Sequence, residues 1–377
     1  MGLFDVYPLF EITPVRGEGV FVYDNKGREY LDLYGGHAVI SIGHSHPNYV
    51  EAVQRQVEKL GFYSNSVRNP LQEELAEKLG KLSGFEDYQL FLCNSGAEAN
   101  ENALKLASFQ TGRSKVLYFE RSFHGRTSGA VAVTDNPAIQ ASYNQDHQVE
   151  RLSFGDVAAL EEALTRGDVA AVIFETIQGV GGLEEMSSEF LRKVAAYCKE
   201  NGSLLIADEI QCGYGRTGDF FAFQRHGITP DIISMAKGMG NGFPIGGILI
   251  HPRIQSRHGL LGTTFGGNHL GCAAGIAVLE TLEKEELIQK AGTFSQYLAL
   301  KAAEYPQIKR IRGRGLMIGL EFDFEVASLR KRLLYEYGIF TGSASDKNLL
   351  RILPPLIIEE KHFEFFFSAL DKALTDN

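Results

Sequence analysis

The chain has 377 residues, 44% of them hydrophobic, and a formal net charge of -10 at pH 7. This length predicts a sizeable core and two domains, or one large domain with a smaller one appended. The acidic balance argues against nucleic acid or an anionic membrane as the main partner. The four scattered cysteines lack zinc spacing, and there is no leader pattern and no run of about 18 apolar residues. We therefore expect a cytoplasmic protein without a metal site or a membrane span.

The chain begins with a hairpin pattern and then alternates between strands and helices. The hairpin covers residues 19–33, with its turn at Asn25, Lys26 and Gly27. Short apolar runs then predict strands, and the stretches between them show helical periodicity. The expected strands are 88–93, 115–120, 170–175, 203–209, 231–236 and 246–252, and the expected helices are 97–110 and 189–200.

Strands that alternate with helices predict an α/β fold with a mostly parallel sheet covered on both faces. From about Leu270 the pattern changes to a long helical stretch over 271–287, shorter strands over 315–322 and 349–354, and a closing helix after Glu359. We expect three parts. They are an N-terminal segment (1–45) that joins the small domain, a large domain (46–270) and a C-terminal small domain (271–377).

Lys237 is the only charged residue between Ile232 and Ile250. Burial disfavours the ammonium form, so the amine of a buried lysine can act as a nucleophile near neutral pH. Most lysines are solvated surface residues, which is the alternative for Lys237. Asp208, however, also ends an apolar run, Asn94 follows the predicted strand 88–93, and Glu175 ends the predicted strand 170–175. Ligands bind at the carboxyl ends of the strands in such sheets, so these residues indicate a site.

A phosphate site is predicted where the strand 88–93 runs into a helix. Ser95 and Gly96 leave free backbone N–H groups at the helix N-terminus, although an ordinary helix cap at Ser95 is the alternative. The turn lacks G-x-G-x-x-G, which favours one phosphate over two. A buried Asp208 needs a partner, either a protonated ring nitrogen or a core arginine.

Together these residues fit pyridoxal phosphate (PLP), which offers an aldehyde to Lys237, a pyridine nitrogen to Asp208 and a phosphate to the helix terminus. Phe123 could stack on the ring, with a place in the core as the alternative. The amide of Gln211 follows Asp208 closely enough to reach another polar atom of the ring.

Arg126 and Arg351 are candidates for binding a carboxylate. Arg351 lies in the apolar run 349–358, where an arginine is unexpected unless an anion pairs with it. The alternative for both is a structural salt bridge.

Eight motifs are spread along nearly the whole chain. They are YLDLYGGHAVISIGHSHP, CNSGAEANENALKLA, SFHGRT, ADEIQCGYGRTG, PDIISMAKGMGNGFPIGG, GTTFGGNHLGCAAG, RGRGLMIGLEF and LRILPPL. In this order they resemble the class III, or omega-amino acid, aminotransferases of fold type I. The acetylornithine and ornithine aminotransferases are the branch that the chain resembles most. The resemblance implies PLP as the cofactor.

The resemblance also implies roles for single residues. Lys237 would bond the cofactor and Asp208 would keep the ring nitrogen protonated. Thr264 resembles a threonine that reaches the phosphate of the neighbouring subunit, which implies a homodimer with shared active sites. The remaining cofactor contacts would be Ser95, Gly96 and Ala97 at the phosphate, Phe123 on the ring face and Gln211 at the ring hydroxyl.

Substrate contacts follow from the same resemblance. Arg126 and Thr263 match substrate-contacting positions, and Arg351 matches the arginine that binds the alpha-carboxylate of glutamate or 2-oxoglutarate. His37 occupies a position that varies with substrate, so it either contacts the amino donor or is a packed core histidine.

Val180 departs from the family pattern. Many relatives have a glutamate there that pairs with the carboxylate-binding arginine. Either Arg351 in this chain has no glutamate partner and stays open throughout, or Glu184 or Glu185, farther along the chain, substitutes for that glutamate.

We expect an enzyme that moves the terminal amino group of N-acetylornithine, or another N-acylornithine, to 2-oxoglutarate. The products would be the semialdehyde and glutamate, and the pathway arginine biosynthesis. Free ornithine or another omega-amino acid is the alternative donor. An aminomutase or decarboxylase on the same scaffold, or a binding protein without catalysis, are the other classes.

Overall fold

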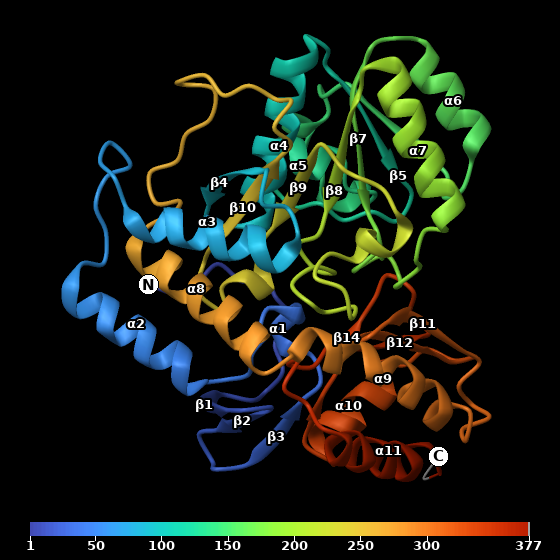
Figure 1. Cartoon of the computed structure of the whole chain (residues 1–377). Coiled ribbons are helices and arrows are strands. Elements are labelled where there is room, and N and C mark those ends of the chain that lie inside the picture. The colour runs from blue at the N-terminus through green and yellow to red at the C-terminus, as the bar shows by residue number, and fades with distance from the viewer. Residues whose placement is uncertain (376–377) are drawn as a thin grey trace.

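A seven-stranded sheet forms the centre of the larger half of the molecule (Figure 1). The structure is a computed structural model that describes residues 1–375. The strand order is β4-β10-β9-β8-β7-β5-β6, and β5 to β9 run parallel to one another. β10 runs antiparallel to both of its neighbours. The strands are β4 (Gln89–Cys93), β5 (Lys115–Phe119), β6 (Val149–Leu152), β7 (Val169–Glu175), β8 (Leu204–Asp208), β9 (Ile232–Met235) and β10 (Gly246–Ile250).

Helices cover both faces of this sheet. Alternate residues of β7 separate the two sides, because Ala171 and Ile173 belong to the core that includes α4, whereas Val172 and Phe174 belong to the core that includes α6 and α7. Both faces are therefore dry, which explains why these strands are continuous apolar runs in the sequence. The helices of this half are α2 (Pro47–Lys59), α3 (Pro70–Ser83), α4 (Gly96–Thr111), α5 (Ser128–Ala132), α6 (Val157–Thr165), α7 (Ser188–Asn201) and α8 (His269–Lys284).

Two smaller sheets and three helices form the other half of the molecule (Figure 1). The N-terminal hairpin joins this half because β3 pairs in parallel with β13 near the C-terminus. The first sheet contains β1 (Pro14–Glu18), β2 (Phe21–Asp24), β3 (Glu29–Asp32) and β13 (Ile339–Phe340). The second contains β11 (Arg310–Arg314), β12 (Met317–Glu321), β15 (Leu349–Ile352) and β14 (Gly342–Ser343). The helices are α9 (Leu287–Ala302), α10 (Ala327–Tyr335) and α11 (Glu360–Thr375).

The predicted α/β fold is confirmed, and each expected strand of the middle of the chain overlaps an observed one. The helix expected over 271–287 is shorter than predicted. It ends at Lys284, because Glu286 has a left-handed backbone (φ 54°) and a new helix begins at Leu287. The division into 1–45, 46–270 and 271–377 stays a prediction.

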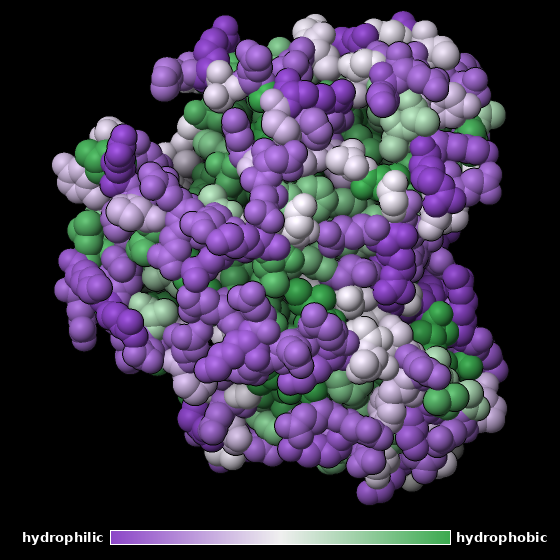
Figure 2. All heavy atoms as spheres, viewed as in Figure 1, coloured by the Kyte–Doolittle hydropathy of each residue, from purple (hydrophilic) through white to green (hydrophobic). Residues whose placement is uncertain are grey.

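The face of the molecule in Figure 2 is covered mostly by hydrophilic residues, with hydrophobic atoms showing between the two halves. Among residues 1–375, no helix is both long and apolar enough to cross a membrane.

Candidate active site

A cavity of about 380 Å³ opens at the carboxyl ends of β7 and β8. It also reaches the turns that follow β4 and β9, which explains how residues far apart in the sequence meet there. Eight of the predicted site residues line this cavity. They are Ser95, Gly96, Ala97, Phe123, Arg126, Asp208, Gln211 and Lys237.

Asp208 ends β8 with its carboxylate almost fully buried (3% exposed). Its Oδ2 contacts Nδ1 of His124 at 2.7 Å and accepts a hydrogen bond from the Asn100 amide at 2.8 Å. The backbone N–H of Ile210 donates to Oδ1 at 3.0 Å. The alternative of a core arginine as partner is wrong. The network fixes the carboxylate at the wall of the cavity, where it can face a cationic ring nitrogen.

Lys237 follows β9 and begins the short 3-10 helix η4 (Lys237–Met239). Its backbone is left-handed (φ 45°), a conformation that costs a non-glycine residue about 1–2 kcal/mol. The side chain retains partial exposure through the cavity that it lines. Burial lowers the pKa of Lys237 to about 8, and this effect exceeds the opposing attraction of Asp208. The surface alternative for Lys237 is therefore wrong.

The turn after β4 contains a helix cap and also backbone N–H groups at the start of α4 that have no partner in the described part of the chain. Ser95 caps α4, since its hydroxyl accepts a hydrogen bond from the Glu98 N–H at 3.2 Å. Within residues 1–375, the N–H groups of Gly96 and Ala97 have no acceptor. A side chain at position 96 would force Ile210 to shift, because a Cβ would lie 2.9 Å from the Ile210 side chain. The turn can therefore bind one phosphate with backbone groups.

Phe123 and Gln211 lie on the wall of the cavity. Phe123 is half-buried and lines the cavity, so its placement in the core is wrong. Gln211 is 7% exposed, and its Oε1 accepts a hydrogen bond from Arg351 at 3.3 Å.

Arg351 lies on β15, beside the cavity, and is 3% exposed. Its Nη1 donates to the Gly179 carbonyl at 2.6 Å and to Gln211. Within the described chain its buried Nε has no partner. Neither Arg351 nor the exposed Arg126 pairs with a carboxylate of residues 1–375, so the salt-bridge alternative is wrong for both. A buried guanidinium without a carboxylate partner is suited to bind an anionic substrate.

Glu184 and Glu185 do not replace the missing glutamate at position 180. Glu184 pairs with Arg310 and Arg312, at 2.9 and 3.4 Å. Glu185 pairs with Arg314 at 3.1 Å. In this structure Arg351 has no carboxylate partner among residues 1–375, and that it stays open with substrate bound remains a prediction.

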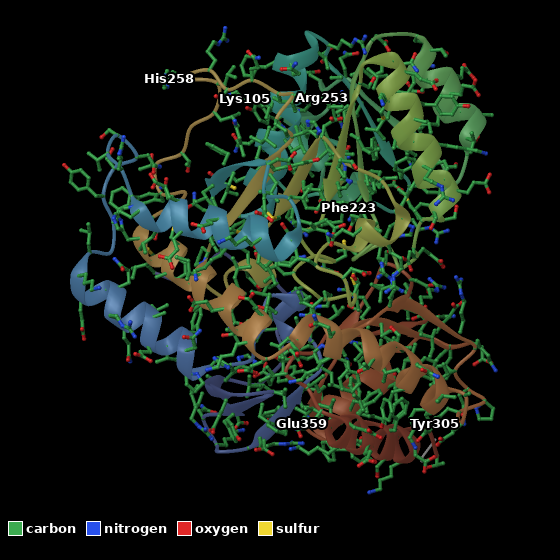
Figure 3. The ribbon with its side chains drawn as sticks, in the orientation of Figure 1. Lys105, Phe223, Arg253, His258, Tyr305 and Glu359 are labelled. Atoms are coloured by element: carbon green, nitrogen blue, oxygen red, sulfur yellow. The ribbon has the colours of Figure 1, made fainter. Side chains whose placement is uncertain are left out.

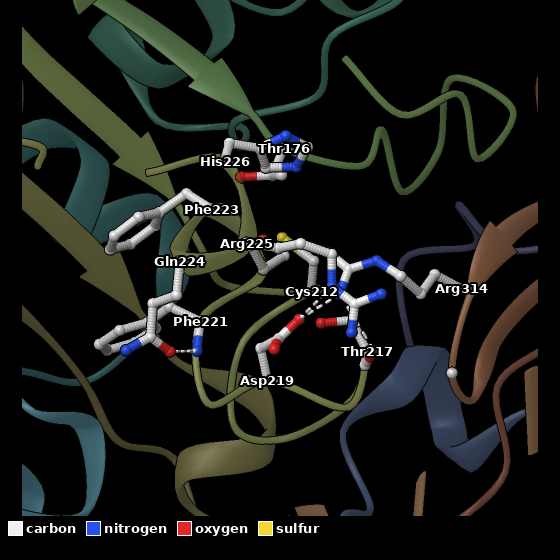
Figure 4. Close-up of polar contacts among 12 residues, drawn as sticks. Thr176, Cys212, Thr217, Asp219, Phe221, Phe223, Gln224, Arg225, His226 and Arg314 are labelled. Carbon is white, nitrogen blue, oxygen red and sulfur yellow. Dashed lines mark hydrogen bonds and ion pairs between the residues drawn. The ribbon is translucent and has the colours of Figure 1, made fainter. Parts of the chain in front are cut away.

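The Glu185 pair belongs to a clamp between the two halves of the molecule. Arg314 also pairs with Asp219 and donates to the carbonyls of Thr217 and Ala222, at 3.2 and 3.0 Å (Figure 4). Because Arg314 is on β11 and its partners follow β7 and β8, this buried arginine fixes the segment that leads away from Val180.

His37, Thr263 and Thr264 do not line the cavity. His37 is exposed and lies against the Tyr34 ring, with a centroid distance of 4.6 Å, so the core histidine alternative is wrong. Its pKa is lowered by partial loss of solvation of the ring and by the charges of Lys237 and Arg351. The Thr263 hydroxyl donates to Glu98 at 3.2 Å, outside the cavity, and Thr264 is exposed. Neither threonine forms part of the cavity wall of its own chain.

These groups fit PLP. A buried carboxylate, a lysine of lowered pKa, a flat aromatic side chain and a helix N-terminus with two free N–H groups surround one cavity. Lys237 would hold the aldehyde carbon, Asp208 the ring nitrogen, and Gly96 and Ala97 the phosphate.

Comparison with known proteins agrees with this geometry. The family model of the class III aminotransferases matches residues 5–374. The chain belongs to the class III aminotransferases. It is 40% identical to the acetylornithine aminotransferase of Methanocaldococcus jannaschii, over 98% of this chain and 95% of that protein. The same enzyme of Bacillus subtilis is also 40% identical, over 99% of this chain and 97% of that protein.

Solved structures place the fold in the same family. The ornithine aminotransferase of Toxoplasma gondii has a TM-score of 0.89 and 30% identity, with 98% of this chain and 91% of that chain covered. The acetylornithine aminotransferase of Elizabethkingia anophelis has a TM-score of 0.85 and 31% identity, with 98% and 96% covered. As a class III aminotransferase, the protein is a PLP-dependent transaminase that takes an amino donor and an oxo acid. The predicted family and cofactor are confirmed.

Sequence reasoning missed two buried residues of this transaminase site, Asn100 and His124, which hold Asp208. Glu175, which the sequence already placed at this edge of the sheet, lines the cavity beside Asp208. Asn100 could have been found, because it is a polar residue on the apolar face of α4, between Ala99 and Ala103. His124 follows Phe123 directly, and no pattern in the sequence indicates its partner.

The lowered pKa of Lys237 predicts how the cofactor-free enzyme takes up PLP. Only the neutral amine attacks an aldehyde, and with a pKa of about 8 the neutral fraction rises from about one tenth at pH 7 to about nine tenths at pH 9. We expect the uptake rate, followed by stopped-flow absorbance, to rise roughly ten-fold over this range and then level off. The reaction of PLP with a free alkylamine in the same buffers is the control. A rise that continues beyond pH 10 would contradict the prediction.

Proposed function

We propose that the enzyme transfers the terminal amino group of N-acetylornithine, or another N-acylornithine, to 2-oxoglutarate. The products are the semialdehyde and glutamate, and the reaction is a step of arginine biosynthesis in the cytoplasm. The observation that carries the proposal is Arg351, a buried guanidinium without a carboxylate partner in residues 1–375, beside the cavity of Lys237 and Asp208. It suits the carboxylate that glutamate and 2-oxoglutarate share. The acetylornithine aminotransferases that match nearly the whole chain support the choice of donor.

PLP supplies an electrophilic aldehyde and a ring that withdraws electrons. The pKa of Lys237, about 8, provides a neutral amine near physiological pH, so the Nζ can remove the proton beside the donor nitrogen and later return it. Asp208, held by His124 and Asn100, places its carboxylate at the position of the ring nitrogen.

Arg351 and Arg126 orient the substrate. Arg351 binds the carboxylate of the oxo acid or glutamate, and Arg126, which lines the same cavity, binds the amino donor. Fixing the carboxylate selects which carbon faces Lys237. Val39 and Phe243 add apolar surface to the cavity wall, which limits access of water to the reacting carbon.

An ornithine delta-aminotransferase is the second candidate. The solved ornithine aminotransferase from Toxoplasma gondii favours it, with a TM-score of 0.89. The sequence identity to that protein is 30%, against 40% for the acetylornithine aminotransferases. An aminomutase remains a less favoured alternative.

Half-reaction rates test the donor. The PLP-loaded enzyme is mixed with N-acetylornithine, N-succinylornithine, ornithine or 4-aminobutyrate, and the loss of the aldehyde-form absorbance is followed by stopped flow. We expect the highest kcat/KM with an N-acylornithine, and conversion with glutamate as well. A preference for free ornithine would contradict the choice of donor. A lack of response to glutamate would contradict the choice of acceptor.

Val180→Glu should change the balance between the two half-reactions. The new carboxylate would pair with Arg351 and compete with the carboxylate of glutamate, so we expect the KM for glutamate to rise roughly ten-fold. The kcat/KM for the amino donor should change much less. Val180→Gln, of the same size without the charge, is the matched control. Equal rate constants for Val180→Glu and Val180→Gln in both half-reactions would show that position 180 does not act on Arg351.

We further propose a homodimer in which Thr263 and Thr264 of one subunit complete the active site of the other. The loop 251–268 that carries them projects from the body of the molecule, with His258 near its tip (Figure 3). Large apolar side chains are exposed on and near this loop, and the rings of Phe62 and Phe265 lie 5.3 Å apart. Exposed apolar groups of this kind are typical of an interface.

Complementation tests the shared site. Lys237→Ala removes the lysine of a subunit's own site, and Thr264→Asp places a negative charge beside the phosphate in the partner's site. Each variant alone should be inactive. Co-expressed together, they should recover about a quarter of the wild-type rate, because random pairing makes half of the dimers mixed and each mixed dimer has one intact site. An inactive mixture would contradict the shared site.

We also propose the domain division 1–45, 46–270 and 271–377. The parallel pairing of β3 with β13 supports placing the N-terminal segment with the C-terminal domain. Limited proteolysis that cleaves near 45 and 270 would support these boundaries.

A further inference from the structure

Glu175 is a buried carboxylate at the cavity to which the proposed reaction gives no role. It is 5% exposed and ends β7, directly opposite Asp208 in the register of the parallel strands β7 and β8. Register partners in a sheet point to the same face, so two carboxylates lie side by side at the cavity wall. Such a pair is unfavourable unless each member is stabilised by its own partners.

The partners of Glu175 are two backbone N–H groups from separate segments. Phe123 donates to Oε2 and Gly179 donates to Oε1, both at 2.9 Å. Phe123 follows β5 and would stack on the cofactor ring, whereas Gly179 lies in the segment that follows β7. One carboxylate thereby joins the ring-stacking side of the site to a second segment.

Gly179 connects this second segment to the carboxylate-binding side of the site. Its carbonyl accepts the hydrogen bond of Arg351 at 2.6 Å, and the same arginine donates to Gln211. Gly179 also lies close to Gln211, because a Cβ at position 179 would be 2.3 Å from its Oε1. A shift of Gly179 would therefore move both Arg351 and Gln211.

The charge of Glu175 also matters at this position. Its electrostatic neighbours include Asp208 and His124, and its own charge acts on Lys237 and Arg351. Burial raises the pKa of Glu175, because the charged form loses solvation that two N–H groups replace only in part. A carboxylate buried in the cavity wall at this cost indicates a use in the site.

We propose that Glu175 is a positioning residue that couples the two ends of the active site, holding Phe123 against the cofactor ring and Gly179 against Arg351. The inference rests on the proposed function, since it takes Arg351 as the carboxylate-binding group. Loss of Glu175 then disturbs carboxylate binding and cofactor orientation together, although the side chain contacts neither ligand in this scheme.

Two substitutions test this coupling. Glu175→Gln keeps the shape but replaces one acceptor with an NH₂ group that faces a backbone N–H. Gly179→Ala leaves Glu175 in place and displaces the same segment through the contact with Gln211. The second variant provides the test if the first does not fold.

Glu209→Gln is the matched control. Glu209 is 1% exposed and likewise accepts from two backbone N–H groups, those of Ala222 at 2.8 Å and Phe223 at 3.2 Å. Thr176 donates to it at 3.0 Å, and Thr176 and Phe223 are visible in the clamp region of Figure 4. Glu209 does not line the cavity.

Three quantities are measured on the PLP-loaded proteins. They are the dissociation constant of glutarate by calorimetry, the visible circular dichroism of the bound cofactor, and the Tm. We expect Glu175→Gln and Gly179→Ala to weaken glutarate binding at least ten-fold, and Glu175→Gln to change the circular dichroism. Glu209→Gln should lower only the Tm.

The outcomes separate this inference from the proposed function. If Glu175→Gln and Gly179→Ala bind glutarate like the wild type, Glu175 does not position Arg351 and the inference is overturned. The same holds if Glu209→Gln weakens glutarate as much as Glu175→Gln does, since any buried glutamate would then suffice. Wild-type glutarate binding that Arg351→Met leaves unchanged would overturn the carboxylate-binding role of Arg351, and with it the proposed function.

Discussion

The pairing of β7 with β8 in register is the constraint on which the site depends. It brings Glu175 and Asp208 together at one buried edge of the sheet. Neither carboxylate has an arginine or lysine paired to it within residues 1–375, so each needs hydrogen bonds from nearby elements. Asp208 is hydrogen-bonded to α4 and to the segment after β5. Glu175 is hydrogen-bonded to the segments after β5 and β7. Satisfying two carboxylates fixes three segments, and these segments enclose the cavity.

Much of this arrangement could be predicted from the sequence, because buried parallel strands leave an unmistakable pattern. The apolar runs that precede Asp208 and Lys237 contain no other charged residue. The charged residue at the end of each run therefore marks the edge of the sheet where ligands bind. The glycine at the start of α4 points to a phosphate for an equally local reason. Alternation of strands with helices was sufficient to predict the fold class.

The parts that could not be predicted depend on contacts between distant segments. An apolar run reads the same in either direction, so the antiparallel course of β10 is not visible in it. The availability of Arg351 depends on Glu184 and Glu185 being bound to arginines of β11, more than 120 positions away. His37 looks like a core residue in its apolar setting. It is exposed because residues 35–38 form a left-handed turn that the two glycines begin.

The placement of β10 has a consequence for how the protein is made. β4 is an edge strand whose single neighbour is β10, with Cys93 opposite Gly246. Residues 89–93 therefore leave the ribosome long before β10 is synthesised. During that time β4, and the phosphate turn that follows it, have no neighbouring strand to pack against. Contacts between such distant residues slow folding and leave strand edges exposed to other chains. Synthesis of β10 comes directly after Lys237, so the strand that docks the phosphate turn becomes available only once the catalytic lysine has been made.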